Sequence, residues 1–213
     1  MKAGTQDAQP EMADLERKNT AVNRNVPFDF EEHDTIKGLY LITPHLFTDF
    51  RGDYKKVYEK NVYSAHGIGQ SFSETSEIVS GKGVLRGLHY QTRDSQAKLV
   101  HVIKGKIFDV AVDLRPNSET FGQWAGFVLE EGENKAVFIP EDFAHGFLVL
   151  EDNTVFTYQC SGEYRPEYCG GIRWDDPSLN VAWPLEEIGT PILSEKDKNN
   201  TITVEEYRRR FVG

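Results

Sequence analysis

Short runs of strand-forming residues recur at intervals of roughly ten residues along most of this chain, and this spacing constrains the fold more than any other feature. The predicted strands are Ser71–Val79, Val84–Gln91, Lys98–Ile103, Lys106–Leu114, Trp124–Leu129, Ala136–Ile139, Phe147–Leu150 and Thr154–Cys160. An earlier run, Ile36–Ile42, predicts one more strand, ended by Thr43 and Pro44. So many short strands favour an all-β fold, either a closed barrel or a two-sheet jelly roll.

The run Lys106–Leu114 shows the clearest strand pattern. From Phe108 onward, apolar residues at even positions alternate with Asp109, Ala111 and Asp113 at odd positions. Because successive side chains of a strand point to opposite faces, the two sets are expected on different faces of a sheet.

The chain is predicted to hold one folded domain. Residues 1–28 are polar and are interpreted as an N-terminal extension, disordered or partly helical around Met12–Lys18. Residues 29–213 are predicted to form the jelly roll, with Val204–Phe211 as a short closing helix. No apolar run is long enough to span a membrane, and no apolar stretch near the N-terminus is typical of a signal peptide. With only Cys160 and Cys169, a cytoplasmic protein with reduced thiols is the simplest expectation.

The net charge of −10 argues against general nucleic-acid binding. It does not exclude a small phosphorylated ligand, because a few local arginine and lysine side chains can hold a diphosphate.

The stretch Gly83–Gln91 carries the first chemical signal. Arg86 and His89 would lie on opposite faces of a regular strand, but Gly87 between them is a natural site for a β-bulge. A bulge would bring both side chains into one cavity. The alternative is a buried structural histidine beside a surface arginine.

Downstream residues extend the candidate site: Lys98, His145, Tyr158, Tyr164 and Asp197. A histidine oriented by a carboxylate can act as a base, a lysine can stabilise an enolate, and a tyrosine can return a proton. Each residue alone also has an ordinary structural interpretation, and the spacing does not show that they converge. A metal site is disfavoured, because Gln91 follows Tyr90 where a second histidine ligand would be needed.

Six segments, in the same order along the chain, resemble the dTDP-4-dehydrorhamnose 3,5-epimerase family. They are Gly83–Gln91, Lys98–Val100, Phe108–Arg115, Ile139–Phe147, Gly171–Pro177 and Leu193–Asp197, within a match from about Lys37 to Lys198. The resemblance implies a cupin-type jelly roll (double-stranded β-helix), a homodimer that swaps strands, and no metal or other cofactor.

The resemblance also implies roles for individual residues. His89 resembles the family's base, Asp197 its carboxylate partner, Tyr158 its proton donor, and Lys98 the lysine near the C4 carbonyl oxygen. Further residues match positions that bind the substrate: Arg51, which would reach the nucleotide across the dimer, and Arg86, His145, Tyr164 and Lys196.

The chain departs from the family where the nucleotide base is expected. Lys56 replaces a usual Glu, Glu74-Thr75-Ser76 replaces Gln-Asp-Asn, and Cys169 replaces a Glu. An ammonium only donates hydrogen bonds and a carboxylate only accepts them. If both Lys56 and Glu74 face the base, cytosine would suit them better than thymine; Ser76 is a further expected substrate contact. The alternative is neutral variation at the surface.

The sequence therefore predicts a metal-independent epimerase. Its substrate would be a nucleotide-diphospho-4-keto-6-deoxy sugar. The enzyme would invert C3, or both C3 and C5, in deoxysugar and O-antigen-type polysaccharide synthesis. Two alternatives stay open: a 3,4-ketoisomerase on the same substrate class, and a non-catalytic cupin that binds sugar nucleotides.

Overall fold

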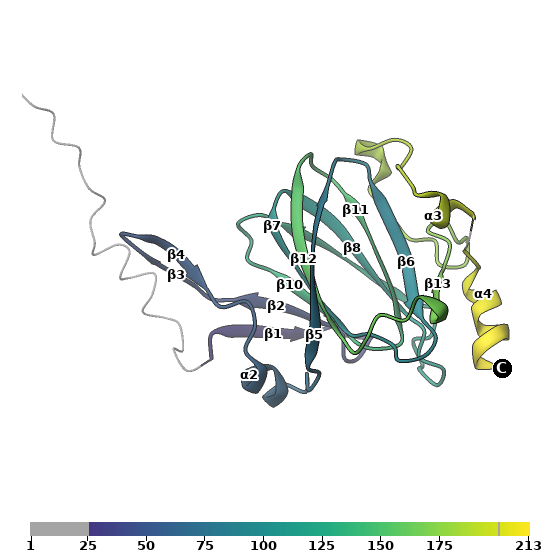
Figure 1. The fold of residues 1–213 in the computed structure, drawn as a ribbon, viewed down its shortest axis with the longest axis horizontal. Coiled ribbons are helices and arrows are strands. Elements are labelled where there is room, and N and C mark those ends of the chain that lie inside the picture. Colours follow the sequence, from purple (N-terminus) through teal and green to yellow (C-terminus); the bar gives the residue numbers. More distant parts are fainter. Residues whose placement is uncertain (1–25, 200) are drawn as a thin grey trace, which may run out of the picture.

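Two antiparallel β-sheets packed face to face form the body of the protein in the computed structural model, which describes residues 26–199 and 201–213 (Figure 1). The six-stranded sheet has the order β1 (Phe28–Glu32), β2 (Tyr40–Pro44), β10 (Ala136–Ile139), β7 (Lys98–Lys104), β12 (Thr154–Ser161) and β5 (Phe72–Ser80). The five-stranded sheet has the order β13 (Cys169–Gly171), β6 (Leu85–Gln91), β11 (Phe143–Val149), β8 (Lys106–Asp113) and β9 (Trp124–Glu130). The predicted jelly roll is confirmed.

The space between the sheets holds the main apolar core. From β8, Ile107 and Ala111 point into this space and meet Val100, Phe147 and other inner residues. The opposite face of β8, with Phe108 and Val110, packs under the C-terminal segment instead. The predicted alternation in β8 is therefore confirmed, and both of its faces lie against other parts of the protein.

Short helices cover the outer faces of the two sheets. α2 (Lys60–Ala65) lies outside the six-stranded sheet, where Tyr63 is fully buried. The five-stranded sheet is covered by the chain after β13, which includes α4 (Val204–Tyr207) and its continuation η3 (Arg208–Val212). The predicted closing helix is thus confirmed. The remaining short helices are η1 (Pro166–Tyr168), η2 (Leu185–Glu187) and α3 (Glu195–Asn199). In the described residues, no helix is long and apolar enough to cross a membrane.

A bulge interrupts the pairing of β6 with β11. His89 lies opposite His145, but Arg86 lies opposite Phe147, so β6 has one more residue than β11 between these two pairs. This is the predicted bulge at Gly87. Only glycine fits there: the φ angle of Gly87 is +119°, and an added Cβ would lie 2.5 Å from the Cα of Gly146.

The hairpin β3 (Leu46–Asp49) and β4 (Gly52–Lys55) projects away from the two sheets (Figure 1). Arg51 sits at its tip, between Asp49 and Gly52, which pair at the ends of the two strands. The exposed hairpin residues include Phe50 and Tyr54.

Two predictions about elements need correction. The strand predicted over Ile36–Ile42 begins only at Tyr40. The preceding residues form a turn instead, because Gly38 has a φ of +85° and the His33 amide donates to the Leu39 carbonyl. The strand expected from Phe147 begins at Phe143, since its seven residues are all buried and show no alternation. Neither β1 nor α2 was foreseen. The proposed helix at residues 12–18 lies outside the described residues.

Candidate active site

Two rows of side chains face each other across the space between the sheets. On the five-stranded sheet, His89 and His145 are direct cross-strand neighbours. On the six-stranded sheet, Lys98 pairs with Cys160, and Tyr158 lies one inward position further along β12. The rings of His145 and Tyr158 are 6.5 Å apart, edge to face. The two sheets thus present their candidate proton-transfer groups to the space between them.

His89 is held by a carboxylate from the far end of the chain. Its Nε2 lies 2.6 Å from Oδ1 of Asp197 in α3. Ser194 donates to the second oxygen of Asp197 at 2.9 Å and also accepts the Asp197 amide hydrogen. Burial alone would raise the pKa of Asp197, but hydrogen bonds from His89 and Ser194 hold it below its usual value. The carboxylate therefore stays ionised and accepts the Nε2 hydrogen, which leaves Nδ1 of His89 as a proton acceptor.

Asp109 forms a second histidine–carboxylate pair that sequence reasoning did not assign to the site. Its Oδ2 lies 2.8 Å from Nε2 of His145, and the carboxylate is fully buried. Its other oxygen has no hydrogen-bond partner among the described residues. The sequence pattern of β8 could have indicated Asp109 as a site residue, because Asp109 shares a strand face with Ala111 and Asp113. A buried acid on an apolar strand is a strong indication of a site.

Burial shapes the two other catalytic candidates. Loss of solvent lowers the pKa of Lys98, although the nearby Cys160, Cys169, Asp109 and Glu74 favour its charged form. Burial also raises the pKa of Tyr158 above its usual value, so the phenol keeps its proton at neutral pH.

Glu74 and Ser76 lie beside these groups on the neighbouring strand β5, and Arg86 lies on β6 with His89. On β5, Ser76 pairs with Tyr158 and Glu74 pairs with Cys160, and the Ser76 hydroxyl donates to Glu74 Oε1 at 3.0 Å. Arg86 Nη2 lies 3.4 Å from the hydroxyl of Ser80.

Gln91 occupies the position where a metal-binding cupin would need a histidine. Its side-chain amide donates to the carbonyls of Asp94 and Glu163, at 2.6 and 3.2 Å, and its oxygen accepts from the Arg165 amide. Gln91 therefore anchors the loop that carries Tyr164, whose ring is more than half exposed. In the described part of the chain, no three His, Cys, Asp or Glu side chains group closely enough to hold a metal ion.

Three further predicted substrate contacts are exposed or paired with other side chains. Arg51 is bound by Asp49 within the hairpin, and its side chain is 76% exposed. Lys56 is paired with Glu59 at 2.5 Å. Lys196 is exposed on α3, beside Asp197.

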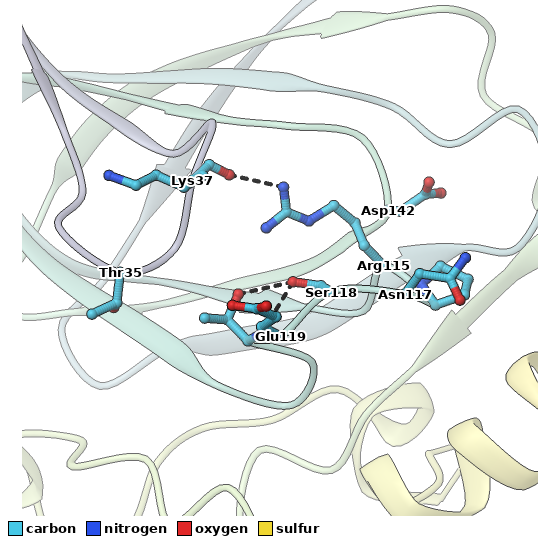
Figure 2. A pocket seen from close by; sticks show the side chains of 9 residues that line it. Thr35, Lys37, Arg115, Asn117, Ser118, Glu119 and Asp142 are labelled. Carbon is cyan, nitrogen blue, oxygen red and sulfur yellow. Dashed lines mark hydrogen bonds between the residues drawn. The ribbon is translucent and has the colours of Figure 1, made fainter.

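A separate groove of about 550 Å³ contains none of the predicted site residues (Figure 2). Its wall is built around Arg115, which binds Asp113 through two nitrogens and donates to the Lys37 carbonyl. The positive charge on this wall is therefore already neutralised by the protein.

An epimerase needs a proton acceptor and a proton donor that face each other, as the candidates His89 and Tyr158 do on the two sheets. Inversion removes a proton from one side of a carbon and returns it on the other. The fold and the site thus define an enzyme of the acid–base isomerase class.

Comparison with known proteins identifies the family. Residues 33–205 match the dTDP-4-dehydrorhamnose 3,5-epimerase family, and the chain belongs to it. The enzyme of that name from Methanothermobacter thermautotrophicus is 46% identical over 165 residues, which cover 78% of this chain and 89% of the relative.

Solved structures agree with this assignment. The 3,5-epimerase RmlC from Legionella pneumophila, in complex with dTDP-4-keto-L-rhamnose, matches with a TM-score of 0.78 and 38% identity, covering 84% of this chain and 93% of that one. ChmJ, a 3'-monoepimerase from Streptomyces bikiniensis in complex with dTDP-quinovose, matches with a TM-score of 0.77 and 30% identity, covering 85% of this chain and 91% of that one.

Proposed function

We propose that this epimerase inverts C3 of a nucleotide-diphospho-4-keto-6-deoxy sugar, with His89 as the base and Tyr158 as the acid. The observation that carries the proposal is the placement of these two side chains on the inner faces of opposite sheets. A sugar ring between them would present one side to the imidazole and the other to the phenol.

The proposed reaction uses the acidity of a C–H bond next to a ketone. Nδ1 of His89 takes the C3 proton, and the electron pair moves toward the C4 carbonyl oxygen. Lys98 stabilises the negative charge that develops on this oxygen. Tyr158 then gives its hydroxyl proton to C3 from the other side, so the configuration is inverted.

The number of inverted carbons is part of the proposal. The relatives include both 3,5-epimerases and a 3'-monoepimerase. We propose C3 inversion for this chain, with C5 inversion as a second step that the same groups can perform. Its place would be deoxysugar synthesis in the cytoplasm, for an O-antigen-type polysaccharide.

The nucleotide is proposed to be thymidine diphosphate, since the structures reported above hold dTDP-linked sugars. The cytosine hypothesis required Lys56 and Glu74 to face the base. Lys56 is bound to Glu59 and Glu74 accepts a hydrogen bond from Ser76, so both groups already have partners.

The direct test is incubation in D₂O with TDP-, CDP-, UDP- and GDP-linked 4-keto-6-deoxy sugars. Deuterium at C3 and C5 is then measured by NMR. We expect deuterium at C3 of the TDP-linked sugar together with inverted product. Absence of deuterium from every sugar would contradict the proposed function, and carbonyl migration to C3 would indicate a ketoisomerase.

We further propose a homodimer in which Arg51 reaches the partner's cavity. Within its own chain, Arg51 sits at the tip of a hairpin that projects away from the sheets (Figure 1). Mixing Arg51→Ala with His89→Ala protein tests this. With random exchange of equal amounts, half of the dimers are mixed. If Arg51 acts across the dimer, each mixed dimer has one intact site of two, so the mixture should recover about a quarter of the wild-type activity. No recovery would place Arg51 in its own chain's site or outside any site.

A further inference from the structure

A single inversion by the proposed mechanism leaves the enzyme in the wrong protonation state. His89 ends with one proton too many, and Tyr158 ends with one too few. His89 can release its proton directly, because its side chain is 42% exposed to solvent. Tyr158 lies partly buried between the sheets, and its phenolate needs a route by which a proton can return.

The neighbouring strand β5 offers such a route. Ser76 lies directly opposite Tyr158 in the β5–β12 register. Burial raises the pKa of Tyr158, whereas the side chain of Ser76 acts in the opposite direction and lowers it. The Cβ atoms of directly paired residues are about 5 Å apart, so these two side chains are neighbours on one face of the sheet. Ser76 also donates to Oε1 of Glu74 at 3.0 Å.

Glu74 completes the connection to water. It lies two residues before Ser76 on the same face of β5, and it is exposed to solvent. Its carboxylate can therefore exchange protons with water. Hydroxyl and carboxyl groups both gain and lose protons, whereas the amides usual at these positions in the resembled family do so far less readily.

We propose that Glu74 and Ser76 form a proton relay that returns a proton from solvent to Tyr158 after each inversion. The Glu74 carboxylate, which accepts a hydrogen bond from Ser76, first takes a proton from water. The Ser76 hydroxyl then turns to the phenolate oxygen and gives it its proton, and the new carboxyl proton of Glu74 moves to the Ser76 oxygen. His89 releases its extra proton to water, so the cycle is balanced and no electrons change hands.

The relay gives this chain's departure from its family a function unrelated to the nucleotide base. The inference rests on the proposed roles of His89 and Tyr158. The competing interpretation is that Glu74 and Ser76 only contact the substrate or only stabilise β5. These interpretations differ in which step of the reaction slows when the residues are changed.

Rapid-quench kinetics with the TDP-linked 4-keto-6-deoxy sugar separates the steps. Glu74→Gln keeps the size and polarity of the side chain but cannot pass a proton, and Ser76→Ala removes the bridge. Since every site starts with a protonated Tyr158, the first turnover should proceed at the wild-type rate in both variants. A burst of about one product per site should follow, and then a steady rate at least tenfold below wild type, with kcat/KM unchanged.

The matched control is Glu77→Gln, the same chemical change on the opposite, exposed face of β5. It should show neither a burst nor a lower steady rate. Equal slowing of the first and later turnovers, a rise in KM alone, or unchanged kinetics in both variants would overturn the relay. A wild-type enzyme without any deuterium exchange would instead contradict the proposed function.

Discussion

The bond between His89 and Asp197 gives the sharpest prediction, because its contribution can be bounded from its geometry. The bond is 2.6 Å long and its carboxylate is 4% exposed. A hydrogen bond to a charged group contributes about 1.5–3 kcal/mol. At 1.36 kcal/mol per tenfold change in rate, Asp197→Asn should slow proton removal roughly 10- to 150-fold.

Removing the base itself should cost more. A positioned general base contributes roughly 10²–10⁴-fold, so His89→Ala should fall below Asp197→Asn and show no measurable deuterium uptake at C3. The assay is uptake from D₂O by NMR under identical enzyme concentrations. Circular dichroism and the thermal midpoint should show that both variants are folded.

The matched control is Asp175→Asn, which changes an exposed aspartate paired with Arg173. Its uptake rate should equal that of the wild type. Wild-type uptake in Asp197→Asn would show that the carboxylate neither orients nor charges the base. Wild-type uptake in His89→Ala would remove His89 from the role of base altogether.

Three further predictions concern the acid, the buried histidine and the nucleotide. Tyr158→Phe should reduce inverted product much more than loss of label from C3 of the starting sugar, and equal losses would show that Tyr158 only positions the substrate. Burial, with the charge of Lys55, lowers the pKa of His101 to about 4. In the unfolded chain the same imidazole binds a proton below about pH 6.5, whereas in the folded protein it stays neutral down to about pH 4. The free energy of unfolding should therefore fall by about 3 kcal/mol between pH 6.5 and 4. Urea unfolding of His101→Gln should lack that part of the pH dependence, and an unchanged profile would refute the assignment. In competition binding, TDP should bind more tightly than CDP with Lys56→Glu leaving the order unchanged, whereas tighter CDP binding would support the cytosine hypothesis.

Local pattern predicted much of the framework and part of the site. The alternation in β8 fixed its two faces, and the glycine between Arg86 and His89 predicted the bulge that the β6–β11 register shows. These features depend on a few adjacent residues, so a single sequence contains them.

Contacts between segments far apart in the chain could not be predicted from local sequence patterns. Asp197 lies 108 residues beyond His89, and only the family resemblance joined the two. Asp109 was missed because an acid facing an apolar core has no local signature of its partner, His145. Arg51 could be assigned only by resemblance, since its proposed target is in a second chain.

The bulge in β6 also determines which parts of the protein can change over evolutionary time. Gly87 and Gly146 meet backbone to backbone: a Cβ at Gly146 would lie 2.7 Å from the Arg86 carbonyl, as one at Gly87 would from the His145 carbonyl. A side chain at either position would push the two strands apart and displace His89 and His145 together. Tyr164, on an exposed loop, and Cys169, in β13, are free of this constraint. Substitutions there can therefore accumulate while His89 and His145 keep their places.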